Sequence, residues 1–130
     1  GKGARINSGT DVSIITYGLG VHWALEWMTA HPEVSVDLID LRSLLPWDQQ
    51  LVEESARATG RVLVLHEDTL TGGIGGEIAA HINEHCFQTL DAPVVRCASL
   101  DTPVPMNLEL ENNFLAKSRL DAALKRLLSF

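Results

Sequence analysis

The sequence predicts a single α/β domain of three layers, in which helices cover both faces of a mainly parallel sheet. Short apolar segments recur along the chain, longer amphipathic segments separate them, and glycine or proline turns lie at the boundaries. Strands that are apolar on both faces and alternate with helices are typical of a sheet buried between two helix layers. We therefore expect one domain over residues 1–130.

Composition and charge predict a domain that binds neither nucleic acid nor a membrane. The chain has 130 residues, of which 45% are hydrophobic, and 10 Lys and Arg against 17 Asp and Glu give a net charge of -7. This charge repels phosphate backbones, and no apolar run approaches the ~18 residues of a membrane span. Cys86 and Cys97 lack CxxC spacing, which favours reduced thiols in a cytosol-like compartment. The chain begins without Met, so we expect it to be part of a longer polypeptide.

The first predicted unit is a strand followed by a helix. Val12–Tyr17 is a run of apolar and β-branched residues that predicts a buried strand. Glycines follow it and allow the turn into an amphipathic helix over Val21–Ala30. Before this unit, Ala4–Ile6 is compatible with an edge strand.

The second unit repeats this order. Val34–Leu41 alternates as a strand, and residues 45–60 supply the next helix. Asp48 is placed to accept a hydrogen bond as the N-cap of this helix. Gly60 is placed to end it, because glycine adopts the left-handed conformation found after helix ends.

The third unit contains a glycine-rich loop. Arg61–His66 predicts an apolar strand, and a helix is expected from Gly73 to Leu90. A dinucleotide-binding loop would need Gly-x-Gly-x-x-Gly, and here Gly73 and Gly75 fit but Ile78 occupies the third place. No GK[ST] follows, so we interpret the glycines as small residues that let the helix start against neighbouring backbone.

The last part of the chain predicts one strand and one helix. Residues 91–101 form the strand, and the proline-bearing residues 102–115 are expected to form a loop. Residues 118–130 predict an amphipathic helix with Ser118 as its cap.

The predicted third helix contains a motif that could bind a metal ion. His81, Glu84 and His85 match the HxxEH pattern of inverted zinc peptidases, and Glu77 lies one turn before His81. A zinc hydrolase is therefore an alternative function of another class. The same helix has an apolar stripe at Ile74, Ile78, Ile82 and Cys86, which places the histidines on a solvated face without any metal.

Polar residues also follow two adjacent predicted strands. His66 and Asp68 end one strand, and Ser99 and Asp101 end the next, at the edge where α/β sheets bind ligands. A Ser-His-Asp hydrolase could be drawn from them, but no GxSxG turn presents a nucleophile. We expect no catalytic, cofactor-binding or metal residue in this chain.

Four segments in order carry a family resemblance: GTDVSIITYG, DLRSLLPWD, TGRVLVLHEDTLTGGIGGEI and LDAPVVRCASLDTPVP. Together they resemble the C-terminal domain of the beta subunit of thiamine diphosphate-dependent 2-oxo acid dehydrogenases, a domain shared with transketolase. LLPWD and EHCFQTLDAPV look more like the branched-chain (2-oxoisovalerate) enzyme. The pyruvate enzyme and transketolase or deoxyxylulose-phosphate synthase are the alternatives within this fold.

The resemblance implies a five-stranded sheet whose N-terminal edge strand is antiparallel to the others. It also implies a reaction, the oxidative decarboxylation of a branched 2-oxo acid with transfer of the acyl group to a lipoyl arm. In this family the alpha subunit holds thiamine diphosphate and Mg²⁺, so we expect this domain to bind neither. The glycines Gly72, Gly73, Gly75 and Gly76 are then expected to permit a tight strand-to-helix passage and close packing, without meeting a phosphate.

The work that the resemblance implies for the domain is assembly. The expected partners are the alpha subunit or region, a second beta subunit, and the binding domain of the lipoyl acyltransferase core. We expect Phe130, Asp101, Gly72 and Gly73 at partner contacts, and the carboxylate of Phe130 paired with a basic residue of the core protein. The implied compartment is the bacterial cytoplasm or the mitochondrial matrix.

Overall fold

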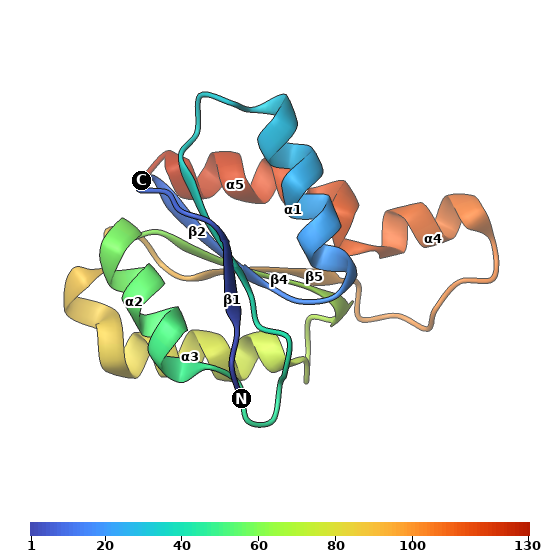
Figure 1. Cartoon of the computed structure of the whole chain (residues 1–130). Coiled ribbons are helices and arrows are strands. Elements are labelled where there is room, and N and C mark those ends of the chain that lie inside the picture. Colours follow the sequence, from blue (N-terminus) through green and yellow to red (C-terminus); the bar gives the residue numbers. More distant parts are fainter.

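The computed structural model describes residues 1–130 and confirms the predicted three-layer α/β class (Figure 1). Five strands form one sheet in the order β1-β3-β2-β4-β5. Neighbouring strands from β3 to β5 are parallel, and β1 pairs antiparallel with β3 at the edge, as the resemblance implied. The strands are β1 (Ala4–Asn7), β2 (Val12–Thr16), β3 (Val36–Asp40), β4 (Val62–Thr69) and β5 (Val95–Ser99).

Two helices cover each face of the sheet (Figure 1). On one face lie α1 (Leu19–Ala30) and α5 (Leu120–Leu128), and on the other lie α2 (Gln49–Thr59) and α3 (Ile74–Cys86). The layers follow from crossovers between parallel strands, since each strand–helix–strand connection must pass over one face.

The sheet therefore separates two hydrophobic cores. In β2 the fully buried Ile14 packs into the core with Trp23 of α1 and Leu124 of α5. Its neighbour Ile15 packs into the other core with Ile78 of α3. Successive side chains of a strand point to opposite faces of the sheet. Because each face is covered by helices, β2 needs apolar side chains on both of its faces.

Local sequence signals for the second helix are confirmed. The Asp48 carboxylate accepts a hydrogen bond from the Leu51 amide at 3.2 Å and another from the Gly3 amide at 2.9 Å. These hydrogen bonds, with that from Gly3 the stronger, hold the pKa of Asp48 below its usual value. Gly60 ends α2 in the left-handed conformation with φ of 70°.

Some predicted boundaries differ from the structure. The strand expected over Val34–Leu41 is shorter, at Val36–Asp40, and the strand expected to end at His66 continues to Thr69. The third helix ends at Cys86, and a 3-10 turn over Phe87–Thr89 replaces its expected last turn.

The largest error concerns residues 102–115, which were expected to form a loop. They contain α4 (Leu108–Phe114), a short helix that projects from the body of the domain (Figure 1). Asn107 caps it, since its side-chain oxygen accepts from the Glu109 amide at 2.9 Å and the Leu110 amide at 3.4 Å.

The predicted cap of the last helix is also wrong. Ser118 lies inside a 3-10 turn over Ala116–Arg119, and its hydroxyl donates to the carbonyl of Leu115 at 3.0 Å. The helix α5 begins only after Arg119 and has no side-chain cap. No helix of the structure is both long enough and apolar enough to cross a membrane.

Candidate functional site

The loops after β4 and β5 meet at the carboxyl edge of the sheet and bring three predicted interface residues together. Both oxygens of Asp101 accept hydrogen bonds from Thr71, at 2.8 Å from its amide and 2.6 Å from its hydroxyl. The hydroxyl of Thr71, and then its amide, hold the pKa of Asp101 below its usual value. Asp101 and Gly72 are exposed there, whereas Gly73 is buried in the domain.

The glycines of this loop admit the ring of His66. A Cβ added to Gly73 would lie 2.7 Å from Cε1 of His66, and one added to Gly75 would lie 2.6 Å from Nε2. Gly72 is different, because it needs glycine for its φ of +78° and has open space around it. A side chain at Gly73 or Gly75 would thus collide with the buried imidazole, so the close approach of His66 explains why both positions are glycine.

His66 itself is fully buried at the end of the core part of β4. Its Nδ1 donates to the carbonyl of Asp68 at 3.0 Å, and its Nε2 has no hydrogen-bond partner. Loss of solvent is the main reason why the pKa of His66 is lowered, so the ring is neutral at pH 7. Tyr17 lies 6.3 Å from it, centroid to centroid, and burial together with Asp68 raises the pKa of the Tyr17 phenol.

The Ser-His-Asp arrangement considered from the sequence does not form. The hydroxyl of Ser99 donates to the carbonyl of Glu67 and not to His66. His66 uses the backbone of Asp68 and not a carboxylate. The hydrogen bond from Ser99 ties β5 to β4, the hydrogen bond of His66 stays within β4, and neither activates the hydroxyl.

The fourth predicted interface residue, Phe130, lies at the opposite edge of the sheet. Its carbonyl oxygen accepts a hydrogen bond from Nη2 of Arg61 at 2.6 Å, just before β4 begins. The eight residues of β4 separate this point from Thr71 by roughly 20–25 Å. Phe130 and Asp101 therefore cannot contact one small partner domain at the same point, although the side chain of Phe130 is 52% exposed.

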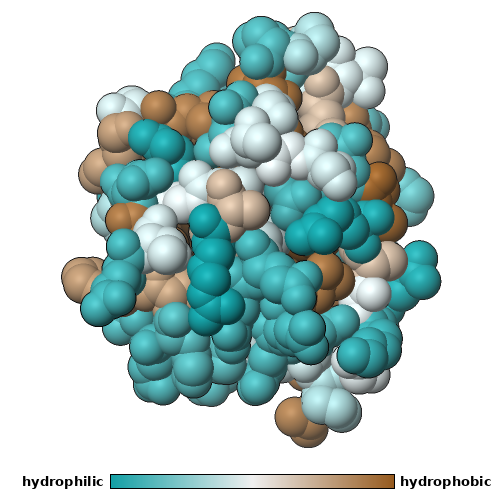
Figure 2. All heavy atoms as spheres, turned by 60° about the vertical axis from the view of Figure 1, so that its left-hand side comes forward, coloured by the Kyte–Doolittle hydropathy of each residue, from teal (hydrophilic) through white to brown (hydrophobic).

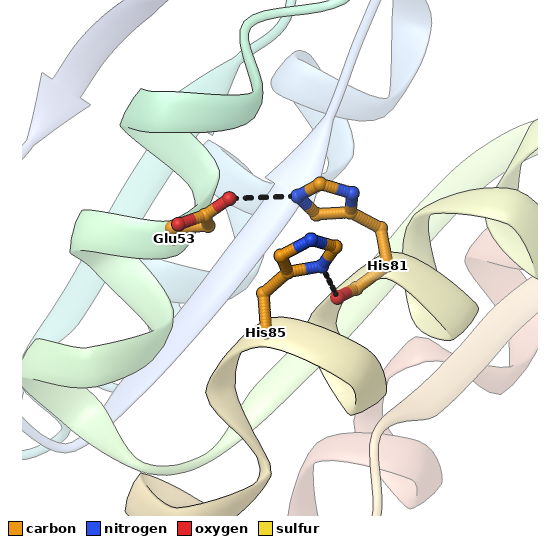
Figure 3. Close-up of side chains that lie close together, drawn as sticks. All are labelled: Glu53, His81 and His85. Atoms are coloured by element: carbon orange, nitrogen blue, oxygen red, sulfur yellow. Dashed lines mark hydrogen bonds and ion pairs between the residues drawn. The ribbon is translucent and has the colours of Figure 1, made fainter.

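Of the two histidines of the HxxEH motif, His85 is exposed, as the apolar stripe predicted, whereas His81 is half-buried between α2 and α3 (Figure 3). Nε2 of His81 lies 2.8 Å from Oε1 of Glu53 in α2, and the His81 ring stacks on His85 at 4.0 Å between centroids. Glu84 and Glu77, the carboxylates adjacent in sequence, are exposed and take no part. The hydrogen bond from His81, followed by that from Arg57, lowers the pKa of Glu53.

The surface missed from the sequence is the projecting segment 100–110, which we call the arm. Its large hydrophobic side chains lie in solvent, with Met106 fully exposed. By contrast, the face shown in Figure 2, on the left in Figure 1, is mainly hydrophilic with scattered hydrophobic residues. Asn107, an N-cap residue before an acidic first turn, was the available signal for α4. The exposed hydrophobic residues of the arm are Leu100, Val104, Met106, Leu108 and Leu110.

One arginine fixes the base of the arm. Arg119 donates from Nη1 to the carbonyl of Asn113 at 2.9 Å and from Nη2 to that of Phe114 at 3.1 Å, at the end of α4. Its Nη2 also donates to the carbonyl of Ala98 in β5. Beside it, a cavity of about 500 Å³ follows the free edge of β5 and is also lined by Arg96 and Arg126.

Known proteins resemble this chain in sequence. Residues 1–119 match the family described as Transketolase, C-terminal domain. The chain is 44% identical over 107 residues to the mitochondrial 2-oxoisovalerate dehydrogenase subunit beta 2 of Arabidopsis thaliana, covering 80% of the chain and 30% of that protein. It is 39% identical over 134 aligned positions to the 2-oxoisovalerate dehydrogenase subunit beta of Bacillus subtilis, covering all of the chain and 41% of that protein.

A solved structure shows the same fold. A split-gene transketolase, described as an inactive beta4 tetramer, superposes with a TM-score of 0.80 at 30% identity, over 98% of this chain and 41% of that one. The chain thus spans only 30–41% of the length of these proteins. The similarity and the exposed position of Glu84 give the zinc hydrolase alternative no support.

Proposed function

Because the chain belongs to the transketolase C-terminal domain family, we propose that it is the assembly domain of a 2-oxo acid dehydrogenase of the branched-chain type. The parent enzyme would decarboxylate 2-oxoisovalerate-type acids oxidatively and pass the acyl group to a lipoyl arm. The supporting observation is the similarity to 2-oxoisovalerate dehydrogenase beta subunits at 44% and 39% identity. Its compartment would be the cytoplasm of a bacterium or the mitochondrial matrix.

Thiamine diphosphate and Mg²⁺ would be bound by other parts of this enzyme. The glycine loop is consistent with this, because packing against His66 explains Gly73 and Gly75 without a phosphate ligand. In this proposal the chain contributes contact surfaces for other subunits, and the reaction occurs on other parts of the enzyme.

The arm would pack against a second copy of the subunit. Its five exposed hydrophobic side chains lie in one segment of the chain, and an unusual number of exposed apolar side chains in one region favours an interface. The split-gene transketolase, matched over 98% of this chain, is itself a tetramer of beta subunits. The alpha subunit would contact other parts of the parent protein and of this domain.

Residues at the end of α5, at the amino edge of the sheet, would serve a different partner, the binding domain of the lipoyl acyltransferase core. Phe130 is half exposed there, and Arg61 holds its backbone in place. Asp101 and Gly72, at the far edge, would then belong to contacts within the dehydrogenase itself.

The arm can be tested by sedimentation of the chain over a range of concentrations. We expect self-association, and we expect Met106→Asp together with Leu108→Asp to weaken it at least ~10-fold, as for central interface residues. Phe87→Asp is the matched control, because Phe87 is 68% exposed but lies on the 3-10 turn after α3. A strict monomer at high concentration, or equal effects of both variants, would contradict the proposal.

The substrate class can be tested with the complete subunit, paired with its alpha subunit. The rate of decarboxylation with 2-oxoisovalerate should exceed the rate with pyruvate, measured with an artificial electron acceptor. A preference for pyruvate would assign the chain to the pyruvate enzyme, and ketol transfer between sugar phosphates would assign it to transketolase.

A further inference from the structure

Three metal-ligand side chains converge between α2 and α3, outside every surface assigned above. Glu53 comes from α2, and His81 and His85 come from successive turns of α3 (Figure 3). One ligand atom from each residue lies within 4.8 Å of the others. We propose that Glu53, His81 and His85 form a binding site for one divalent ion of the zinc class, which ties α2 to α3.

The ligand set defines the class of ion. Two imidazoles and one carboxylate suit zinc and its neighbours, whereas Ca²⁺ and Mg²⁺ prefer oxygen ligands alone. His85 is exposed, so the fourth position of a tetrahedral ion would open to solvent and take a water molecule. The ion would connect two helices, and we assign no hydrolysis to it.

Hydrogen bonds prepare the two rings for this role. A carbonyl can only accept, so Nδ1 of His85 carries a hydrogen and donates it to the carbonyl of His81 at 2.9 Å. Nε2 of His85 is then left with a free lone pair, the form that binds metal. In His81 the hydrogen that Glu53 now accepts from Nε2 would reside on Nδ1 once the ion is bound, and the ring would stay neutral.

The distances require only small side-chain movements. Two ligand atoms about 2.1 Å from a tetrahedral ion are ~3.4 Å apart. The 2.8 Å contact between His81 and Glu53 would therefore open slightly, and the wider separations within the 4.8 Å cluster would close. Rotation of exposed or half-buried side chains on two helix surfaces can provide this without backbone change.

Arg57 is the one nearby cation, and its position is compatible with the ion. It donates from Nη2 to Oε2 of Glu53 at 2.9 Å, while Oε1 of the same carboxylate faces His81. The guanidinium thus holds the carboxylate in place from its far side and leaves the oxygen toward the histidines available. It also donates to the carbonyl of His85 at 3.2 Å, on the backbone of α3.

The site can be tested by titrating the untagged chain with Zn²⁺ and with Co²⁺. We expect one equivalent of Zn²⁺ by equilibrium dialysis and visible absorption of four-coordinate Co²⁺ that Zn²⁺ abolishes. With free Zn²⁺ ~100-fold above the dissociation constant, thermal unfolding should shift upward by on the order of 5–10 °C. Co²⁺ should also quench Trp47, whose ring lies edge-on to His81 at 4.9 Å.

Variants separate this site from general surface binding. His85→Ala and Glu53→Gln should each weaken Zn²⁺ binding at least ~10-fold. His22→Ala, an exposed histidine of α1, should leave it unchanged. His85 is exposed, so its loss should not unfold the chain, and circular dichroism without metal checks this. Binding of no ion, or equal losses in the His22 and His85 variants, would overturn the proposal.

Discussion

Arg61 and Phe130, 69 residues apart in sequence, are joined by a hydrogen bond of 2.6 Å between Nη2 of the guanidinium and the carbonyl oxygen of Phe130. Arg61 directly precedes β4, so this bond fixes the end of the chain at the amino edge of the central sheet. Asp101 and Thr71 form the corresponding link at the carboxyl edge. The two predicted contact regions are thus built on opposite ends of one strand.

Removing Ser129 and Phe130 should weaken binding of the acyltransferase binding domain, because the exposed aromatic ring of Phe130 is lost from the proposed contact. Isothermal titration with the isolated binding domain measures this. Arg61→Met keeps Phe130 but removes its anchor and should cause a smaller loss. Unchanged affinity after the deletion would remove Phe130 from the interface.

Asp101→Asn should lower the thermal unfolding temperature at pH 7, because the charged carboxylate is the better acceptor for Thr71. The pKa of Asp101 is lowered in the folded state, so its stabilising effect is complete above the unfolded value and is lost as the pH falls through the folded value. The difference between variant and wild type should therefore shrink below about pH 4. A difference that stays constant down to pH 2 would contradict this assignment; Glu77→Gln, on the exposed face of α3, serves as control.

Gly75→Ala should cost about 1–3 kcal/mol of unfolding free energy, because its new methyl group would lie 2.6 Å from Nε2 of a fully buried His66. Gly76→Ala is the matched control. The nearest atom to its Cβ is Nη1 of Arg96 at 3.7 Å, so this change should be neutral or stabilise by up to about 1 kcal/mol.

A double variant tests whether His66 is the group that a larger residue at position 75 would meet. If His66 is the obstacle, His66→Ala should be less costly in a Gly75→Ala background than in the wild type, as expected for residues in contact. Denaturant unfolding of the four proteins measures this coupling. Strict additivity would show that the glycine is required for another reason.

Arg119→Met should loosen the arm while leaving the sheet intact. The variant keeps the aliphatic stem but removes the donors to the carbonyls of Asn113, Phe114 and Ala98. Amide hydrogen exchange over Leu108–Phe114 should become faster, whereas exchange in β2 should not change. Arg126→Met, in the same cavity on α5, should leave the exchange of α4 as it is.

The order of strands and helices could be predicted from the sequence because its signals are local. Val12–Thr16 is buried at every position, and an apolar run bounded by glycines predicts that without reference to the rest of the chain. The cap at Asp48 and the left-handed Gly60 are likewise decided by neighbouring backbone. The antiparallel β1 was expected only from the family resemblance, since three residues contain too little pattern.

The tertiary structure decided which residues meet. Glu53 lies 28 residues before His81 and was absent from every sequence motif, yet it is the carboxylate that the histidine contacts. The short helix α4 has a local signal in its cap Asn107, but its anchoring by Arg119 is a tertiary contact that no local pattern could reveal. Periodicity and capping act over a few residues, whereas contacts between elements depend on how the sheet orders its strands. For this reason Asp101 and Phe130, which the sequence analysis both assigned to partner contacts, lie at opposite ends of the strand β4.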